Sequence, residues 1–426
     1  MSLFPSGNGS FHFYLSALNT KVYQRINNII NPTLATQCGD VSRFPAPKHG
    51  ENEDKVRRLG KENVYISQHD WDSHETSWDF KSNELYRLAL GLTYDQVQSS
   101  QMSRVRLNLC LEDAVSKYIQ YWQEKFMQLH RNEEELNRKF IEIYGLQDEL
   151  TPDVPLDEIT ILQKGEISIE DNQIVWHKDV IIKQFISWMV GCFMGRYSAD
   201  KPGLIIASQG QKVADLDLPA MTLEIDDDGI IPIIQEADFF ADDMTQRIEA
   251  GVKVLFGERH FYDNMKYIKA CLGQELRDYL YKDFYADHID GKMYQKRPIY
   301  WLFSSKMGDK KKKGYFKALV YMHRIESDTL SKLHADYVSP YIDKVEQQLK
   351  EAEDDNVRDD LSQAQRNKAN KLAAELAEKV REVKEFATIL AQMSTQRLTI
   401  DLDDGVKTNY PKYYPLVEPI KGLDKE

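Results

Sequence analysis

Hydrophobic positions recur at helical spacing along most of the chain. In the segment 101–144 the apolar residues follow one another at intervals of three and four, which predicts one long helix or a pair of helices. Two further stripes of this kind lie within 330–394, with Asp354-Asp355-Asn356 as a turn between them. Because charged residues flank both stripes, we expect an antiparallel helical hairpin with coiled-coil-like packing.

Shorter segments extend this helical pattern. The residues 11–30 show helical spacing and stop at Asn31-Pro32, since the residue before a proline avoids helical angles. A buried helix is predicted over 178–197, where the spacing of Gly191 and Gly195 indicates close helix packing. The residues 48–63 are polar and charged, and we expect them to form a linker.

A few short segments have the pattern of strands. The run 167–176 alternates around Asp171-Asn172 and predicts a small hairpin. Two short apolar runs within 221–234 flank Asp227-Asp228-Gly229, a strong turn signal, and predict another. The expected fold class is therefore mainly α with small β hairpins (α+β), a multi-helix domain plus a long antiparallel helical hairpin.

A further hairpin-like unit carries a basic tip. The run 299–303 is aromatic and β-branched, which suits a buried strand. The segment 315–322, which fits either a strand or a helix, can return beside it. Between them Gly308-Asp309 is followed by four consecutive lysines. Such a loop can neutralise DNA phosphates, or it can be a solvated tip that keeps the hairpin from aggregating. The candidate DNA-binding residues are Arg43, Lys296, Arg297, Lys310, Lys311, Lys312, Lys313 and Arg324.

Overall charge makes this basic loop stand out. The 426 residues carry a formal net charge of −13 at pH 7, which argues against a general nucleic-acid coat protein. DNA binding through a local basic patch remains compatible with that total, because what matters is charge gathered on one face.

Cysteine usage and hydropathy bear on the compartment. The four cysteines lie far apart and form no CxxC pair, so neither a zinc knuckle nor a disulfide scaffold is indicated. No uncharged apolar run has the length of a membrane span, and the first residues lack the pattern of a signal peptide. We expect a cytoplasmic protein that makes no membrane contact.

One polar cluster has the donor atoms of a metal site. His69, Asp70, Asp72, His74 and Glu75 supply five potential ligands within seven positions. A helix start with acidic residues in its first turn explains the same residue pattern, and the sequence shows no second set of metal ligands. We therefore expect no metal site, and a metal-dependent hydrolase using this cluster is kept as an alternative.

The motifs of a self-sufficient catalyst are missing. An adenine or cytosine-N4 methyltransferase needs a Pro-Pro loop with an aromatic residue to hold the flipped base, and a glycine-rich turn to hold S-adenosylmethionine. Neither is present, and there is no P-loop, HExxH, GxSxG or dinucleotide fingerprint. The sequence indicates no catalytic or cofactor-binding residue, and whether the chain is an enzyme stays open.

Several stretches resemble the C-terminal part of the PglX-type adenine-specific DNA methyltransferases of BREX phage-defence systems. They are DWDSHETSWDF (70–80), ISWMVGCFMGRYSADKPGLI (186–205), FFADDMTQRIEAGVKVLFG (239–257), LRDYLYKDFYADHI (276–289), KRPIYWLFSS (296–305), YFKALVYMHRIESDTL (315–330) and DLDDGVKTNYPK (401–412). The segment 17–45 resembles the closing part of a target-recognition domain in related type IIG and type I systems.

This resemblance implies a division of labour. In the family, a Rossmann-like domain N-terminal to the matching region binds S-adenosylmethionine and holds the target base. The present chain is then expected to be a C-terminal fragment or truncated homologue, without a cofactor of its own, that helps position DNA or dock subunits. Its expected partners are double-stranded DNA and the methyltransferase part or other defence-system subunits. A protein-interaction module without DNA contact is the alternative.

The resemblance and the changes in composition together predict five segments. They are a remnant of a target-recognition domain (1–48), a helical domain (49–155), an α+β domain with small hairpins (156–326), the helical hairpin (327–397) and an extended C-terminal strap (398–426).

Overall fold

The fold is mainly α with small antiparallel sheets, as the sequence predicts. The computed structural model describes residues 11–33, 37–45, 53–99, 107, 109–208, 210–216, 222–289, 298–358 and 361–423. The chain forms two compact units, Met1–Ser77 with Val115–Lys178 and Trp78–Ala114 with Asp179–Glu426. The five-segment division stays a prediction.

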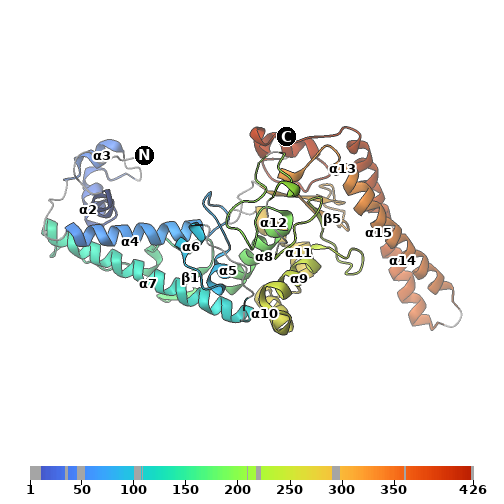
Figure 1. Cartoon of the computed structure of the whole chain (residues 1–426), viewed down its shortest axis with the longest axis horizontal. Coiled ribbons are helices and arrows are strands. Elements are labelled where there is room, and N and C mark those ends of the chain that lie inside the picture. Colours follow the sequence, from blue (N-terminus) through green and yellow to red (C-terminus); the bar gives the residue numbers. More distant parts are fainter. Residues whose placement is uncertain are drawn as a thin grey trace. The chain divides into compact units, whose positions relative to one another are not determined.

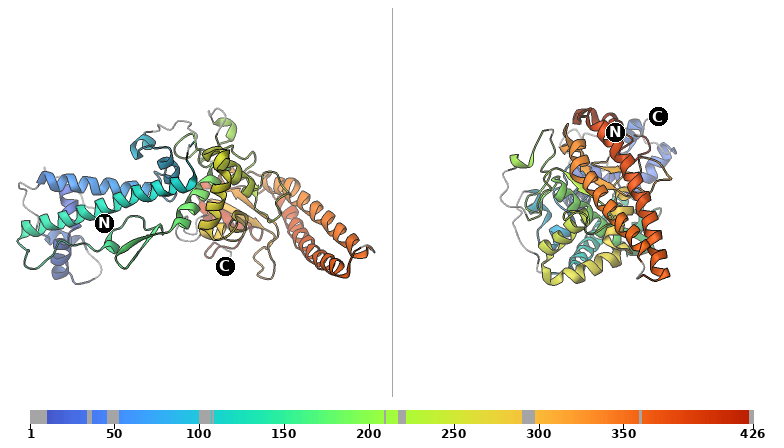
Figure 2. Two further views of the ribbon diagram at one scale, coloured as in Figure 1. Left: turned by 90° about the horizontal axis from the view of Figure 1, so that it is seen from below. Right: turned by 90° about the vertical axis from the view of Figure 1, so that its right-hand side faces the viewer.

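Two long helices dominate the first unit. Its elements are α1 (Phe11–Leu18), α2 (Lys21–Ile30), α3 (Cys38–Arg43), α4 (Glu53–Asp72), the larger part of α7 (Leu111–Tyr144), a 3-10 turn (Leu156–Glu158), β1 (Ile167–Glu170) and β2 (Gln173–Trp176). Helices α4 and α7 run antiparallel and side by side (Figure 1 and Figure 2), since Lys55 pairs with Glu135 while His69 packs on Trp122. A core around Phe13 joins α1, α2, α4 and α7.

The structure corrects two helix predictions in this unit. The helix expected over 11–30 is two helices, because Thr20 takes extended angles and its side chain caps α2 by accepting from the Tyr23 N–H. The segment 48–63 is no linker from Glu53 onward, where α4 begins. The sparse apolar residues there, Val56 and Leu59, are nevertheless buried.

The hairpin predicted over 167–176 is confirmed. Strands β1 and β2 pair antiparallel, with Glu170 opposite Gln173. Asp171 and Asn172 have positive φ values of 48° and 56°, the left-handed angles that two-residue hairpin turns require.

The second unit surrounds a small sheet. Its elements are α5 (Glu84–Ala89), α6 (Tyr94–Gln98), most of α8 (Lys178–Met194), β3 (Ile230–Pro232), α9 (Met244–Phe256), α10 (Phe261–Leu272), α11 (Leu276–Lys282), α12 (Phe284–Ile289), β4 (Tyr300–Ser304), β5 (Lys317–Tyr321), α13 (Thr329–Lys332), a π-helical turn (Leu333–Val338), α14 (Ser339–Val357), α15 (Gln363–Ser394) and α16 (Gly405–Asn409). The strand order is β3-β5-β4, all antiparallel. Every residue of β4 is buried, so the sheet lies inside the unit's core.

Two predicted hairpins of this unit are confirmed. Strands β4 and β5 form the unit expected around the lysines, with Trp301 opposite Val320. Helices α14 and α15 form the antiparallel helical hairpin, which extends away from the sheet (Figure 1).

The hairpin predicted over 221–234 is wrong. Only Ile230–Pro232 forms a strand, and it pairs with β5 rather than with its own neighbours. The preceding residues are held otherwise, because the Asp226 carboxylate accepts the N–H groups of Asp228, Gly229 and Ile230. Among residues 222–229 the structure has no strand.

The C-terminal segment also differs from the extended strap expected over 398–426. It contains α16 and a 3-10 turn at Tyr410–Tyr413. The part that follows runs along β4: the Ser304 N–H donates to the Leu416 carbonyl and the Glu418 N–H to the Leu302 carbonyl, each at 2.9 Å. This segment covers the edge of β4 that β5 does not occupy.

The close packing expected at Gly191 gives a first testable prediction. A Cβ at this position would lie 2.9 Å from the Tyr300 hydroxyl and closer still to the Tyr197 ring, both of which are buried. We expect Gly191→Ala to lower the free energy of unfolding by about 1–3 kcal/mol, as overpacking does.

The control is Gly39→Ala, where a Cβ meets no atom within 4 Å and alanine favours the helix. Urea unfolding followed by circular dichroism would measure both. Equal stability of the two variants would contradict the close approach of α8 to Tyr197 and β4.

Candidate functional site

A buried carboxylate fixes the lysine loop between β4 and β5. Glu382 of α15 is only 5% exposed. Its oxygens accept the backbone N–H groups of Lys313 (2.9 Å), Gly314 (2.9 Å) and Tyr315 (3.0 Å), and the Ser305 hydroxyl at 2.7 Å. Consecutive N–H groups that converge on one anion form a concave anion-binding site, here filled by the protein itself.

Two of the four lysines are engaged by the same helix. The Lys312 ammonium lies 2.7 Å from Glu385, and that of Lys313 lies 3.5 Å from Glu378. Lys310 and Lys311 are exposed, and among the described residues no ion pair joins them. The loop therefore uses two lysines in ion pairs with α15, and the other two are exposed without an ion pair to any described residue.

The structure gives each of the other predicted DNA-binding residues a separate outcome. Arg43 is exposed in the last turn of α3, in the first unit. Lys296 and Arg297 lie outside the described residues. Arg324 donates to the carbonyls of Asp227 (2.6 Å) and Met194 (3.4 Å), so its guanidinium holds the turn before β3.

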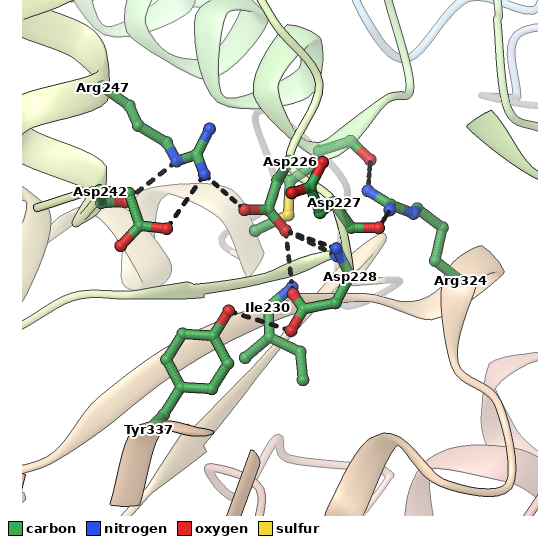
Figure 3. A network of polar contacts seen from close by, with 10 residues as sticks. Asp226, Asp227, Asp228, Ile230, Asp242, Arg247, Arg324 and Tyr337 are labelled. Carbon is green, nitrogen blue, oxygen red and sulfur yellow. Dashed lines mark hydrogen bonds and ion pairs between the residues drawn. The ribbon is translucent and has the colours of Figure 1, made fainter. Parts of the chain in front are cut away.

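That turn is the centre of a polar network (Figure 3). Arg247 forms an ion pair with Asp226 at 2.6 Å and a second with Asp242 at 3.2 Å. Tyr337 donates to the Asp228 carboxylate at 3.0 Å. The network ties α9 and the π-helical turn to the start of β3.

An open cleft of about 540 Å³ lies beside this network. Its charged lining comprises Lys212, Arg324 and Lys332 against Asp227, Asp228 and Glu326. Burial, aided by the positive Arg196, lowers the pKa of the lining His323 to about 4, so this imidazole is neutral near pH 7. The positive and negative side chains balance, which gives the cleft no preference for an anion.

Three side chains of the His69–Glu75 cluster have separate hydrogen-bond partners. His69 faces the Tyr121 hydroxyl, the Asp70 carboxylate accepts the Leu162 N–H, and the Asp72 carboxylate accepts from Ser77. Within the part of the chain that the structure describes, no group of three or more His, Cys, Asp or Glu side chains could hold a metal ion. The structure therefore does not bring the predicted ligands together.

His74 from this cluster has a buried partner that the sequence did not reveal. Its Nε2 lies 2.6 Å from Glu166, which is fully buried, and its Nδ1 lies 2.7 Å from the Asp70 carbonyl. Burial is the largest effect on the pKa of His74 and lowers it, but the hydrogen bond and charge of Glu166, with Asp70, outweigh it. The pKa of His74 is therefore raised above its ordinary value.

Sequence reasoning also missed Glu382, although a signal was present. It lies four residues before Phe386 and eight before Leu390, on a side of α15 where apolar residues are buried. A glutamate at such a position requires buried partners. Only the fold shows that these are the amides of a loop almost 70 residues away.

Two curated relatives match this chain over nearly its whole length. It is 32% identical to the adenine-specific methyltransferase BrxX of Escherichia coli O9:H4 (strain HS), over 99% of this chain and 34% of that protein. It is 29% identical to the adenine-specific methyltransferase PglX of Lacticaseibacillus casei (strain Zhang), over 97% of this chain and 32% of that protein. The chain thus spans about one third of the length of these relatives.

Two further findings concern family membership and membrane helices. No family model matches the sequence. Among the described residues, no helix combines the length and the apolar character needed to cross a membrane.

The Glu382 anchor predicts a large loss of stability on truncation. Glu382→Ala would leave two buried N–H groups and one half-buried N–H group without their acceptor, and we expect a loss of about 3 kcal/mol or more. Amide hydrogen exchange at Lys313, Gly314 and Tyr315, together with urea unfolding, would measure it.

The matched control is Glu375→Ala, which removes an exposed glutamate from the same face of α15. It should leave both measurements near the wild-type values. Unchanged protection of the three amides in Glu382→Ala would rule out the anchor.

The His74–Glu166 pair predicts a pH dependence of stability. Because the folded pKa of His74 is raised above 6.5, its contribution is complete below pH 6.5 and is lost as the pH rises through the folded value. We expect the melting temperature of wild type to exceed that of His74→Gln most at pH 6 and least at pH 9.

Glu166→Gln should reduce the same pH-dependent difference, because it removes the charge that raises the pKa of His74. A gap between wild type and His74→Gln that stays constant from pH 6 to pH 9 would contradict this assignment.

Proposed function

The chain is a relative of the PglX-type adenine-specific methyltransferases, and we propose that it serves as a non-catalytic portion of such an enzyme in a phage-defence system. In this role it positions double-stranded DNA or docks other subunits. The observation that carries the proposal is homology over 97–99% of the chain to about one third of two methyltransferases.

The residue content supports a role other than methyl transfer. The 426 residues hold neither the base-holding Pro-Pro loop nor the glycine-rich turn of an S-adenosylmethionine site. S-adenosylmethionine would then bind, and the target base would be flipped, on a part of the enzyme that these residues do not include.

The lysine loop supports a contact with the DNA backbone. Lys310 and Lys311 are exposed on a loop whose backbone is held by hydrogen bonds to Glu382. The two ammonium groups therefore extend from a fixed backbone. Lysine contacts with phosphates position a protein on duplex DNA without reading its sequence. Such a contact suits a subunit that orients DNA for chemistry performed elsewhere.

Subunit docking without DNA contact is the second candidate. The α14–α15 hairpin favours it, because the hairpin extends from the sheet and Leu372 on it is 47% exposed. Retention of other defence-system subunits by a chain that binds no DNA would support this role.

The DNA contact is tested by the salt dependence of binding. We expect Lys310→Ala/Lys311→Ala to reduce the slope of log K against log salt by up to about 2, since each phosphate contact contributes about 0.9. Fluorescence anisotropy of a labelled duplex between about 50 and 200 mM salt would measure the slope.

The control variant Lys61→Ala/Lys117→Ala removes two exposed lysines from α4 and α7 of the first unit. It should retain the wild-type slope. If the wild-type chain binds no duplex even at the lowest salt, the DNA role is refuted and the docking role is favoured.

A further inference from the structure

A cavity of about 700 Å³ lies within the first unit. Its walls come from α1, the start of α2, α4, α7 and the segment that follows α7. Cavities that hold small organic molecules usually measure about 300–1,000 Å³. Because all of its walls belong to one compact unit, the cavity is a property of that unit alone.

One wall of the cavity combines a carboxylate with apolar surface. Leu129, Glu133 and Leu136 all line the cavity and follow one another along α7 at intervals of four and three. Residues at these intervals are neighbours on the surface of a helix. Both leucines are buried, as is Val154, which lines the cavity from the segment after α7. Glu133 itself is half-buried.

Glu133 differs from the next two glutamates of α7 because it has no partner. Glu134 accepts the Val154 N–H at 3.3 Å, and Glu135 forms an ion pair with Lys55. Among the residues that the structure describes, no hydrogen bond or ion pair reaches the Glu133 carboxylate. This carboxylate is therefore available to a group that enters the cavity.

The negative charge of Glu133 is unfavourable in its present surroundings. Burial raises the pKa of Glu133 to about 7, while His130 opposes this effect and the charge of Glu158 adds to it. Lys21 also lines the cavity, but its ammonium group donates to the Asp153 carbonyl and has no ion pair with Glu133. A carboxylate that has lost part of its hydration is stabilised when a cation comes close to it.

A buried hydroxyl in the same cavity also lacks a partner. Ser16 of α1 lines the cavity and is only 4% exposed. No described residue forms a hydrogen bond with its Oγ. A Cβ on Gly60 of α4 would collide with this oxygen, so α4 has a glycine at the point where the two helices approach each other. Buried hydroxyls usually have a partner, and a bound molecule can supply one here.

We propose that this cavity binds a small organic cation, a primary alkylamine, whose ammonium group pairs with Glu133 while its hydrocarbon part lies against Leu129 and Leu136. The ammonium group has three donors and the charge that the carboxylate requires. An inorganic cation would gain nothing from the leucines, and a neutral hydrocarbon would gain nothing from Glu133. This site does not depend on the proposed DNA role.

The test is a calorimetric titration of the full chain with hexylamine, with 1-hexanol as an uncharged compound of the same chain length. We expect saturable binding of hexylamine, and an affinity for 1-hexanol that is lower by about tenfold or more, because hydrogen bonds to charged groups are the stronger ones. The proposal is overturned if hexylamine shows no saturable binding, or if both compounds bind equally well.

The variant Glu133→Gln identifies the carboxylate that is responsible. It keeps the size of the side chain and removes no contact with a described residue, so the fold should persist, which circular dichroism would verify. We expect its affinity for hexylamine to fall about tenfold and its affinity for 1-hexanol to stay unchanged. Wild-type affinity for hexylamine in this variant would contradict the proposed ion pair.

The matched control is Glu124→Gln, which neutralises an exposed glutamate of α7 that does not line the cavity. It should bind hexylamine as wild type does. If both variants lose affinity equally, hexylamine is attracted by the general negative charge of the chain, and the assignment of the cavity is wrong.

Discussion

The arrangement of the sheet loop and the helical hairpin depends on the buried carboxylate of Glu382. Three backbone N–H groups and a hydroxyl converge on this side chain from a segment far away in sequence. A buried charge is tolerated only where hydrogen bonds replace its lost hydration, and the loop amides supply that replacement. The position of the loop is therefore set by α15. This helix consequently also determines where the lysines of the loop lie.

Other charged residues of the chain are likewise used for internal contacts. Lys312, Lys313 and Arg324 all belong to basic stretches that suggest DNA contact, yet each makes internal contacts that hold a turn or a loop. A cluster of charged residues in a sequence does not show whether it binds DNA or holds the fold together, because internal ion pairs and phosphate contacts are made by the same side chains. The distinction comes from the elements that face each residue.

Periodicity was sufficient for the elements whose partners are close in sequence. The long helix α7, the α14–α15 hairpin and the β1–β2 turn at Asp171-Asn172 all follow from local spacing and turn chemistry. The local pattern gave the wrong prediction where contacts distant in sequence determine the secondary structure. Strand β3 pairs with a strand almost 90 residues away. The Glu53 end of α4 is stabilised by packing on other helices. Tertiary packing overrides weak local preference in such segments.

For the candidate site, sequence reasoning located the lysines but could not identify their support. It grouped His69, Asp70, Asp72 and His74 because they are neighbours in the chain. Proximity in the chain does not make a shared site, because the side chains of these four residues each hydrogen-bond to a different partner. Neither Glu166 nor Glu382 could be assigned a partner without the fold, since both act across long separations.

The chain's last segment has a protective role for the sheet. Strand β4 is entirely buried and rich in aromatic residues, and its outer edge is occupied by the residues around Leu416 and Glu418. An uncovered edge of this kind would offer free N–H and carbonyl groups to any other chain. The C-terminal segment thus prevents strand pairing between molecules. Losing it would make the protein prone to aggregate even if every helix remained folded.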